Sequence, residues 1–342
     1  MSGRSRRGIA VTILQYALGL AALAWLLSQV DLGRVVDLLA TLDATTVLAV
    51  LAVSVAGLLA RFYTWYAVID PRGPVRFREA ANTDLIVNFV NQLLPSRLSG
   101  RVAAPFVLRS ETGIAYTDAT AIAGVHTGIY AVLYGLTAAV GVLAVLGRLP
   151  FGLIVLLAGS TGLYLAAGAF VLLAGTNLEL LDVLLDRIAG LAALVPRVGS
   201  ALADRIRGLT EFTTDSTDAF RALAASPGVW LRYALGWTGA LVLAPAARVV
   251  LLLGAFGAAF EPAILLPVVL VAAYSVTLLP LTPGGIGVTE ATATAVFVAL
   301  GVPGEIIVPV VFVDRFLGTY LPAVAGWYPS LKIDTSSLAP DS

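Results

Sequence analysis

The chain has 342 residues, of which 59% are hydrophobic and only 12% are charged, and its mean hydropathy is +0.93. Soluble domains carry about a quarter charged residues, so this composition excludes an ordinary soluble protein and indicates an integral membrane protein. The sequence has no cysteine, which excludes disulfides, thiolate nucleophiles and cysteine metal sites. A formal net charge of zero argues against a nucleic-acid partner.

Apolar segments recur along the chain, most of them at the ~20 residues that a helix needs to cross a bilayer. They cover residues 8–30, 45–69, 119–146, 151–174, 229–256, 262–279, 284–300 and 306–327. We therefore expect an all-α polytopic membrane bundle, folded as a single integral membrane domain over residues 1–342. We interpret the first segment as a retained helix, because it is too long for a typical signal peptide and acidic Asp31 follows it.

Arginines near the ends of these segments predict the orientation through the positive-inside rule. Three arginines precede the first segment, and Arg72, Arg76 and Arg78 follow the second. Almost all basic residues are arginine, a composition typical of a GC-rich prokaryotic genome. We expect a multi-pass protein of a prokaryotic cell membrane, with both the N-terminus and the C-terminus in the cytoplasm.

Two regions are unusual for lipid-facing crossings. Residues 80–94 contain four side-chain amides together with Thr83 and Asp84, and are followed by Arg97, Arg101 and Arg109. A full crossing would leave these arginines outside, whereas a re-entrant hairpin keeps them inside; we prefer the hairpin, and the full crossing is the alternative. Segments 262–279 and 284–300 are both short and meet at a Pro- and Gly-rich break, which indicates a second hairpin that enters from the opposite face.

The expected fold is thus about six full crossings plus two re-entrant helical hairpins, one hairpin in each half. Short or Gly/Pro-interrupted segments in matching places are typical of an inverted-repeat transporter with a site near the bilayer midplane. The first half covers residues 8–174 and the second half residues 229–328. Between them we expect a cytoplasmic helical insert at 175–228, and after them a disordered tail at 329–342.

The break in the second half contains Glu290, and an acid at membrane depth is rare and costly. As a functional group, Glu290 would pair with an arginine or take up a proton. The alternative is a structural ion pair that holds the hairpin to the final helix. Arg315, midway along that helix and directly after Asp314, is the candidate partner in either case.

Two further groups are candidates for binding an anionic head group. Gly284, Gly285 and Gly287 permit tight turns and leave helix N-terminal amides free for an anion, or they form a plain hairpin turn. Arg97 and Arg101 have the guanidinium forks that suit phosphate oxygens, or they snorkel to the interface and fix the first hairpin.

The polar residues of segment 80–94 include Asp84, Asn88 and Asn91, which have helical spacing and face one way. We expect them to line a cavity and to contribute to the substrate site. Three prolines, Pro95, Pro280 and Pro283, are expected to form the structural turns.

Other polar residues receive simpler interpretations. His126, the only histidine, cannot form a metal centre alone and is expected to be a packing residue, with proton relay as the alternative. Arg61, Arg232 and Arg248 are expected to snorkel from helix ends. No nucleotide-binding loop, zinc helix or serine nucleophile elbow occurs in the sequence, so we expect neither a cofactor nor an enzymatic activity.

Two motifs together resemble the lysylphosphatidylglycerol synthase transmembrane region, a flippase-like membrane family. Residues 95–100, Pro-Ser-Arg-Leu-Ser-Gly, are similar to the family's first element, and Pro283 through Glu290 match its Pro-Gly-Gly-x-Gly-x-x-Glu element. Arg315 and Pro322 resemble the arginine and the later proline of its final helix. The first element is degraded, because Gly100 stands where the family has glutamate; the role of that acid is lost or has moved, for example to Asp84.

The resemblance covers residues 8–328 and implies a domain that binds membrane lipids and moves an anionic or lipid-linked head group, of a phospholipid or a polyprenyl phosphate, between leaflets. In fused relatives a soluble domain makes aminoacylated phosphatidylglycerol or transfers a sugar, and this sequence has no such domain. The alternative is a non-catalytic scaffold that binds a separate cytoplasmic glycosyltransferase or aminoacyltransferase through residues 175–228.

Overall fold

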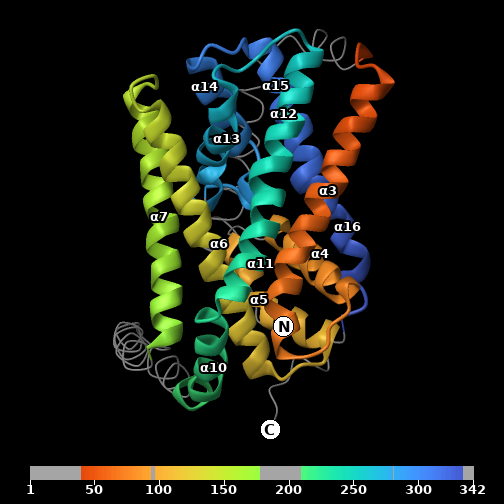
Figure 1. Cartoon of the computed structure of the whole chain (residues 1–342), viewed down its shortest axis with the longest axis vertical. Helices are drawn as coiled ribbons and strands as arrows, with labels where there is room; N and C mark the ends of the chain where they lie inside the picture. Colours follow the sequence, from red (N-terminus) through yellow and green to blue (C-terminus); the bar gives the residue numbers. More distant parts are fainter. Residues whose placement is uncertain (1–39, 94–96, 178–208, 280, 334–342) are drawn as a thin grey trace, which may run out of the picture.

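The computed structural model describes residues 40–93, 97–177, 209–279 and 281–333, and over these ranges the chain is helical and contains no strand (Figure 1). Five helical segments are long and apolar enough to cross a membrane: Ala44–Arg72, Tyr116–Val145, Phe151–Thr176, Pro227–Ala255 and Gly304–Ser330. They match five of the six expected crossings, and the other one, residues 8–30, lies outside the described residues. The prediction of an all-α polytopic bundle is confirmed.

Three of these spans are continuous or nearly so, and two are interrupted by a π-helical turn. The first three are α3 (Ala44–Ile69), which the short 3-10 turn η1 (Asp70–Arg72) extends, α6 (Tyr116–Val145) and α7 (Phe151–Thr176). The fourth is α11 (Pro227–Thr238), the π-turn η2 (Gly239–Leu243) and α12 (Ala244–Ala255). The last is α15 (Gly304–Arg315), the π-turn η6 (Phe316–Tyr320) and α16 (Leu321–Ser330). Helices satisfy their own backbone groups, which lipid cannot do.

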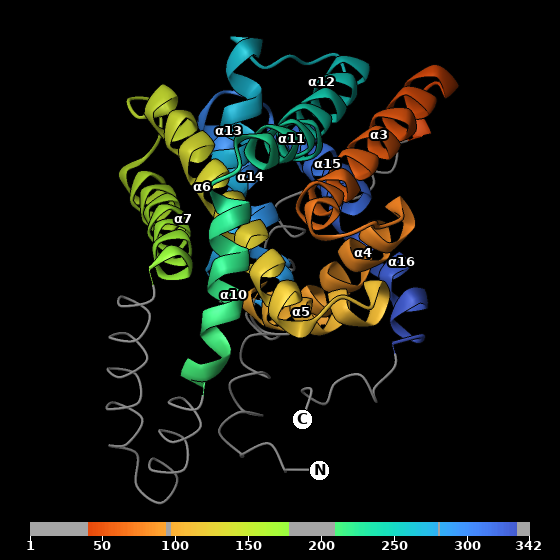
Figure 2. The same ribbon diagram turned by 60° about the horizontal axis from the view of Figure 1, so that its bottom comes forward.

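Local sequence explains where two of these helices begin. Asp43 caps α3 by accepting a hydrogen bond from the Thr46 backbone N–H at 2.9 Å. Ser226 caps α11 in the same way, and Pro227 occupies the first helical position, where no N–H is needed. The spans then stand side by side, with α7 at one edge of the bundle and α3 and α16 on the opposite side in both views (Figures 1 and 2).

The segments before and after the second half, the predicted insert and the predicted tail, differ in part from expectation. The predicted disordered tail begins too early, because α16 continues to Ser330. Of the predicted insert, the described part from residue 209 onward forms α10 (Leu209–Ala224), which packs against α6 and α7. Phe220 of α10 fills the space that a side chain at Gly124 or Gly175 would need. This part of the insert therefore belongs to the bundle.

Two helical hairpins complete the fold and lie toward opposite ends of the bundle (Figure 1). The first is α4 (Phe77–Leu93) and α5 (Arg97–Thr112). The second starts with η3 (Ala263–Leu265), α13 (Leu266–Tyr274) and η4 (Ser275–Leu278), turns at η5 (Pro283–Gly285) and returns as α14 (Val288–Ala299). Neither α4, α5, α13 nor α14 reaches the length of a crossing, which agrees with the hairpin interpretation.

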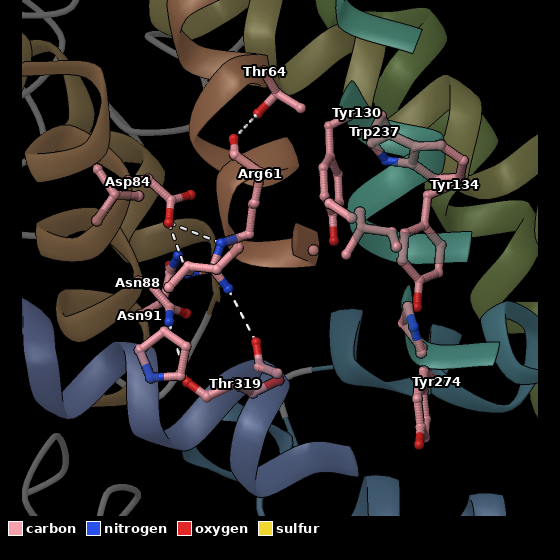
Figure 3. Close-up of a pocket in the computed structure, with 18 of the residues that line it drawn as sticks. Arg61, Thr64, Asp84, Asn88, Asn91, Tyr130, Tyr134, Trp237, Tyr274 and Thr319 are labelled. Atoms are coloured by element: carbon pink, nitrogen blue, oxygen red, sulfur yellow. Dashed lines mark hydrogen bonds and ion pairs between the residues drawn. The ribbon is translucent and has the colours of Figure 1, made fainter. Parts of the chain in front are cut away.

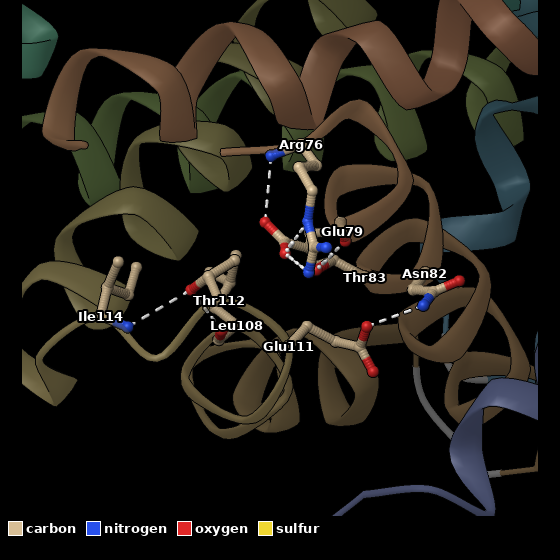
Figure 4. Close-up of polar contacts among 8 residues, drawn as sticks. All are labelled: Arg76, Glu79, Asn82, Thr83, Leu108, Glu111, Thr112 and Ile114. Atoms are coloured by element: carbon tan, nitrogen blue, oxygen red, sulfur yellow. Dashed lines mark hydrogen bonds and ion pairs between the residues drawn. The ribbon is translucent and has the colours of Figure 1, made fainter. Parts of the chain in front are cut away.

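The base of the first hairpin is held by polar contacts (Figure 4). Asn82 on α4 donates a hydrogen bond from Nδ2 to Glu111 Oε2 on α5 at 2.8 Å. At the start of α4, Glu79 accepts hydrogen bonds from the backbone N–H and the Nε of Arg76. Partial burial opposes ionisation of Glu79, but these hydrogen bonds and the guanidinium charge lower its pKa below the usual value. The anionic side chain thus stabilises the helix N-terminus.

The tips of the two hairpins meet inside the bundle. Gly284 of the Pro-Gly-Gly turn lies against the side chain of Gln92 near the end of α4, and a Cβ at Gly284 would stand 1.8 Å from Gln92 Oε1. Gly284, Gly285 and Gly287 have φ of 60°, 75° and 79°, a region that favours glycine. The turn therefore needs glycine both for its backbone conformation and for this close approach.

Helix α16 and helix α4 make a second close contact, at Gly326. A Cβ at this position would lie 2.0 Å from the backbone oxygen of Leu85. We expect Gly326→Ala to lower the free energy of unfolding by about 1–3 kcal/mol, because a backbone group must move to make room. Thermal unfolding of the detergent-solubilised protein measures the effect. Gly162→Ala on α7 is the control, since nothing lies within 4 Å of its Cβ position; an equal response of both variants would contradict this packing.

Candidate functional site

A cavity of about 170 Å³ lies between the spans and both hairpins. It is lined by α3, α4, α6, the span from α11 to α12, the inner end of α13 and the region where α15 continues into η6. Many lining residues, such as Ser54 to Trp65 on α3 and Thr127 to Tyr134 on α6, come from the interior of their helices. The cavity therefore lies well inside the bundle. Figure 3 shows ionic and amide side chains on one side and aromatic rings on the other.

The first ionic contact of the cavity joins α3 to α4. Arg61 Nε donates to Asp84 Oδ2 at 2.8 Å, and its NH2 lies 2.7 Å from the same oxygen. Arg61 NH1 donates to the backbone oxygen of Gly318 in η6 at 3.1 Å. On the next turn of α4, Asn88 Nδ2 donates to the backbone oxygen of Thr319 at 3.2 Å. The first hairpin is thereby attached to the last span.

The second ionic contact is almost fully buried. Arg248 on α12 places both Nε and NH2 2.7 Å from Asp314 Oδ1, and the two side chains are 4% and 2% exposed. Tyr274 donates its hydroxyl to the other carboxylate oxygen, Oδ2, at 2.8 Å. Arg248 passes close to Gly318, where a Cβ would lie 2.8 Å from its NH2. Asp314 is thus fully engaged by a guanidinium and a phenol, as a buried charge requires.

The third ionic contact joins α15 to the second hairpin. Arg315 Nε donates to Glu290 Oε1 at 3.0 Å, and Tyr320 donates its hydroxyl to the same oxygen. Glu290 Oε2 accepts from the backbone N–H of Gly287 at 2.8 Å, which caps α14. Arg315 also lies over the rings of Tyr274 and Tyr320. Arg315 is therefore the partner of Glu290, as expected from the sequence.

One nitrogen of the Arg315 guanidinium has no hydrogen-bond partner among the described residues. Its Nε binds Glu290 and its NH1 donates to Thr319 Oγ1 at 3.1 Å, whereas NH2 makes no hydrogen bond within the described part of the chain. Arg315 lines the cavity. A buried guanidinium N–H without a partner is costly, so this atom is a position at which an acceptor on a ligand would be favoured.

The π-turn η6 brings these contacts together. In a π-helix each N–H bonds to the carbonyl five residues earlier, so the wider turn changes which carbonyl oxygens accept hydrogen bonds within the helix. Leu321 N–H bonds to Phe316 O, and the carbonyls of Gly318 and Thr319 accept from Arg61 and Asn88. Such turns occur frequently at functional sites.

Aromatic residues form the opposite wall. Tyr130, Tyr134 and Trp237 line the cavity together with Trp65, and the Tyr134 and Trp237 rings meet edge to face at 6.2 Å. His126 is stacked on Trp65 with ring centroids 3.8 Å apart, which agrees with its interpretation as a packing residue. No group of histidine, cysteine or acidic residues in the described ranges has the arrangement of a metal site.

Comparison with known proteins identifies the family. The family model described as the lysylphosphatidylglycerol synthase TM region matches residues 12–326. The chain belongs to this family. No curated protein and no solved structure matches it. Membership of the lysylphosphatidylglycerol synthase TM region family and the five helices of membrane-spanning length support a multi-pass membrane domain. Pro283 through Glu290, which resemble one element of that family, form the turn of the second hairpin and the start of α14.

The structure shows which of the candidate substrate-site residues line the cavity and which do not. Asp84, Asn88, Asn91 and Arg315 line it, as the helical spacing on α4 predicted for the first three. Glu290 contacts Arg315 from the side of the second hairpin and is not itself a lining residue. The remaining candidates have other positions. Gly284, Gly285 and Gly287 do not line the cavity, and the Gly287 N–H donates to Glu290 rather than being free for an anion. Pro283 begins the turn, as expected. Pro95, Pro280 and the side chains of Arg97 and Arg101 lie outside the described part of the chain.

Sequence reasoning placed two arginines wrongly. Arg61 and Arg248 do not snorkel from helix ends; both are paired with acids at the cavity. Arg232 does lie near a helix end, where it pairs with Asp70 at 3.0 Å. The number of acids in apolar segments could have shown that these arginines are buried in ion pairs. Three such acids require three cations, and Arg315 supplies only one. Although Gly100 replaces the family glutamate, the first half retains an ion pair, between Arg61 and Asp84.

The Arg248–Asp314 contact yields a stability prediction. We expect Arg248→Met to lower the free energy of unfolding by about 3–5 kcal/mol, because it leaves Asp314 buried without its cation. The double variant Arg248→Met/Asp314→Leu should recover most of this loss, since it removes both charges. Denaturant or thermal unfolding in detergent measures the changes.

A matched control for this comparison is Arg76→Met. Arg76 is paired with Glu79 but its side chain is 84% exposed, so the loss should be at most about 1 kcal/mol. If Arg248→Met were no more destabilising than Arg76→Met, the buried pair would not have the structural weight assigned to it.

Proposed function

We propose that this protein is a flippase-like membrane protein that binds a phosphate-bearing, anionic lipid head group in the central cavity and moves it between leaflets. The observation that carries the proposal is Arg315, which lines a cavity well inside a multi-pass bundle and whose buried NH2 makes no hydrogen bond within the described part of the chain. Guanidinium groups bind phosphate oxygens with strong, charge-assisted hydrogen bonds. Membership of the lysylphosphatidylglycerol synthase TM region family is compatible with the same function.

The charge required to attract an anion is expected from α5. Arg61, Arg248 and Arg315 are each matched by a carboxylate, so these three pairs carry no net charge. From the sequence, Arg97 and Arg101 are assigned to the substrate site. In this proposal they supply the positive excess, and Arg315 supplies the directed hydrogen bond.

The hairpins favour translocation over simple binding. Both hairpin tips contact each other beside the cavity, and one ion pair connects each hairpin to a span: Arg61 with Asp84, and Arg315 with Glu290. Discontinuous helices that meet near the midplane are the usual construction of transporter sites. In this proposal, exchange of these ion pairs for contacts with the head group opens the site to one leaflet at a time.

Reconstitution tests the proposal directly. Proteoliposomes that contain trace fluorescent anionic phospholipid or polyprenyl phosphate should exchange the probe between leaflets faster than protein-free liposomes. We expect Arg315→Gln to reduce the rate by about tenfold or more, because a charge-assisted hydrogen bond is lost. Glu290→Gln should also slow exchange, since it releases Arg315 from its position.

Arg232→Gln serves as the control, because Arg232 pairs with Asp70 at 3.0 Å outside the cavity. It should exchange lipid at the wild-type rate. Equal leaflet exchange with and without protein, across the whole lipid panel, would exclude the translocase function.

A further inference from the structure

We propose that the cavity takes up a proton at His126 together with its anionic ligand, so that translocation is coupled to protons. The inference rests on the proposed function, because it names a second species that the same site binds. It follows from the position of the imidazole on the cavity wall, from the aromatic rings around it and from the charges of the neighbouring side chains.

His126 is an accessible group of the cavity. It lines the cavity from the middle of α6 and is only partly buried, whereas Ile122 and Ile129 on the same helix are completely buried. The imidazole is therefore open to the cavity. A neutral imidazole can take up a proton from water on the ring nitrogen that carries none, and histidine ordinarily does so with a pKa of about 6.5.

The aromatic rings around His126 suit its protonated form. Trp65 on α3 is stacked on the imidazole at a centroid distance of 3.8 Å and an interplanar angle of 15°. Tyr233 on α11 meets it edge to face at 5.2 Å, and the Tyr130 ring is nearly parallel to it at 6.5 Å. Aromatic faces attract cations, and the face of tryptophan does so most strongly. The stack that holds the neutral ring therefore also stabilises the imidazolium.

The charges closest to this stack belong to a neutral ion pair. Arg61 lies one helical turn before Trp65 on α3 and is paired with Asp84. Trp65 is also a hydrogen-bond partner of the Asp84 carboxylate. Because the guanidinium and the carboxylate cancel, a proton on His126 raises the net charge of this part of the wall by one.

Other elements that pack on α6 add no unbalanced charge beside His126 within the described ranges. Leu172 of α7 and Phe220 of α10 occupy the space next to Gly128 and Gly124, two residues to either side of the histidine. The charged and titratable groups of α5, α7, α10, α13 and the start of α6 have partners elsewhere. They are Asp118 with Arg72, Asp218 with Arg221, Tyr164 with Thr277, Tyr274 with Asp314 and Glu111 with Asn82, together with Arg109 near the end of α5.

A proton and an anion in one cavity favour each other. The imidazolium attracts the anion, and by thermodynamic reciprocity the bound anion favours uptake of the proton. A monoanionic head group and one proton together add no net charge, which lowers the cost of their passage through the apolar bundle. In this scheme water on the side of entry supplies the proton, and His126 returns it to water on the side of release.

The single histidine makes this protonation directly measurable. In protein labelled with ¹³C- and ¹⁵N-histidine and purified without a histidine tag, every imidazole NMR signal arises from His126. In phosphatidylcholine nanodiscs we expect it to titrate between pH 5 and 8. Dimethyl phosphate, a soluble monoanion at each of these pH values, should raise its proton affinity about fivefold or more over chloride at equal ionic strength.

Leaflet exchange tests the coupling itself. In proteoliposomes with acyl-labelled phosphatidylglycerol, whose phosphodiester keeps its single charge, we expect exchange to be about fivefold or more faster at pH 6 than at pH 8. His126→Phe keeps a ring on Trp65 but binds no proton, so it should exchange at the wild-type pH 8 rate at both pH values. Asp218→Asn is the control, because the Asp218 side chain is 75% exposed and outside the cavity, and it should keep the wild-type pH response.

The outcomes separate this inference from the proposed function. Exchange that is equally fast at pH 6 and pH 8 would overturn proton coupling and retain the translocase. A pH response that persists in His126→Phe would assign it to the buried acids and would overturn the role of the histidine, as would an imidazole that does not titrate or does not respond to dimethyl phosphate. If the protein exchanged no lipid faster than protein-free liposomes at either pH, the proposed function would fail, and the NMR titration would still decide whether proton and anion bind together.

Discussion

Neutralisation of charge inside an apolar bundle is the constraint on which the rest of the structure depends. A lone ionised side chain at this depth would cost several kcal/mol, so each must meet an opposite charge with good geometry. Within the residues that the structure describes, this requirement is met three times in the interior, by Arg61 and Asp84, Arg248 and Asp314, and Arg315 and Glu290. Each pair joins different elements, so the same contacts that neutralise charge also decide how the spans and hairpins are arranged.

Small residues make these contacts possible, because ion pairs of this kind need backbones to approach closely. Gly318 leaves room for Arg248, Gly326 admits the α4 backbone beside α16, and Gly284 admits Gln92. In a membrane, helices associate through close packing at small residues rather than through the hydrophobic effect. The abundant glycine of this chain is therefore part of the same design as its buried charges: the glycines set the distances at which the charges meet.

Hydropathy and single costly residues made much of this arrangement predictable. The spans, the short segments around the Pro-Gly-Gly break and the pairing of Glu290 with Arg315 all follow from local patterns, since membrane depth leaves few options for an acid. Arg248 and Asp314 are 66 positions apart, and no local pattern reveals such a contact. Arg61 was misjudged because a long side chain within reach of a helix end normally extends to the interface. The π-turns were also missed, because their residues read as ordinary helix.

The π-turn in the last span has a mechanical consequence. Between Arg315 and Tyr320, one and a half turns of backbone bind α3 through Gly318, α4 through Thr319 and α14 through Arg315 and Tyr320. Moving the wide turn by a single residue would rotate these groups together by about 100°, the angle per residue of a helix. All three connections would then break in one step. Both hairpins are thus bound to the same short segment of the last span, so a movement of this segment would disturb the contacts of both.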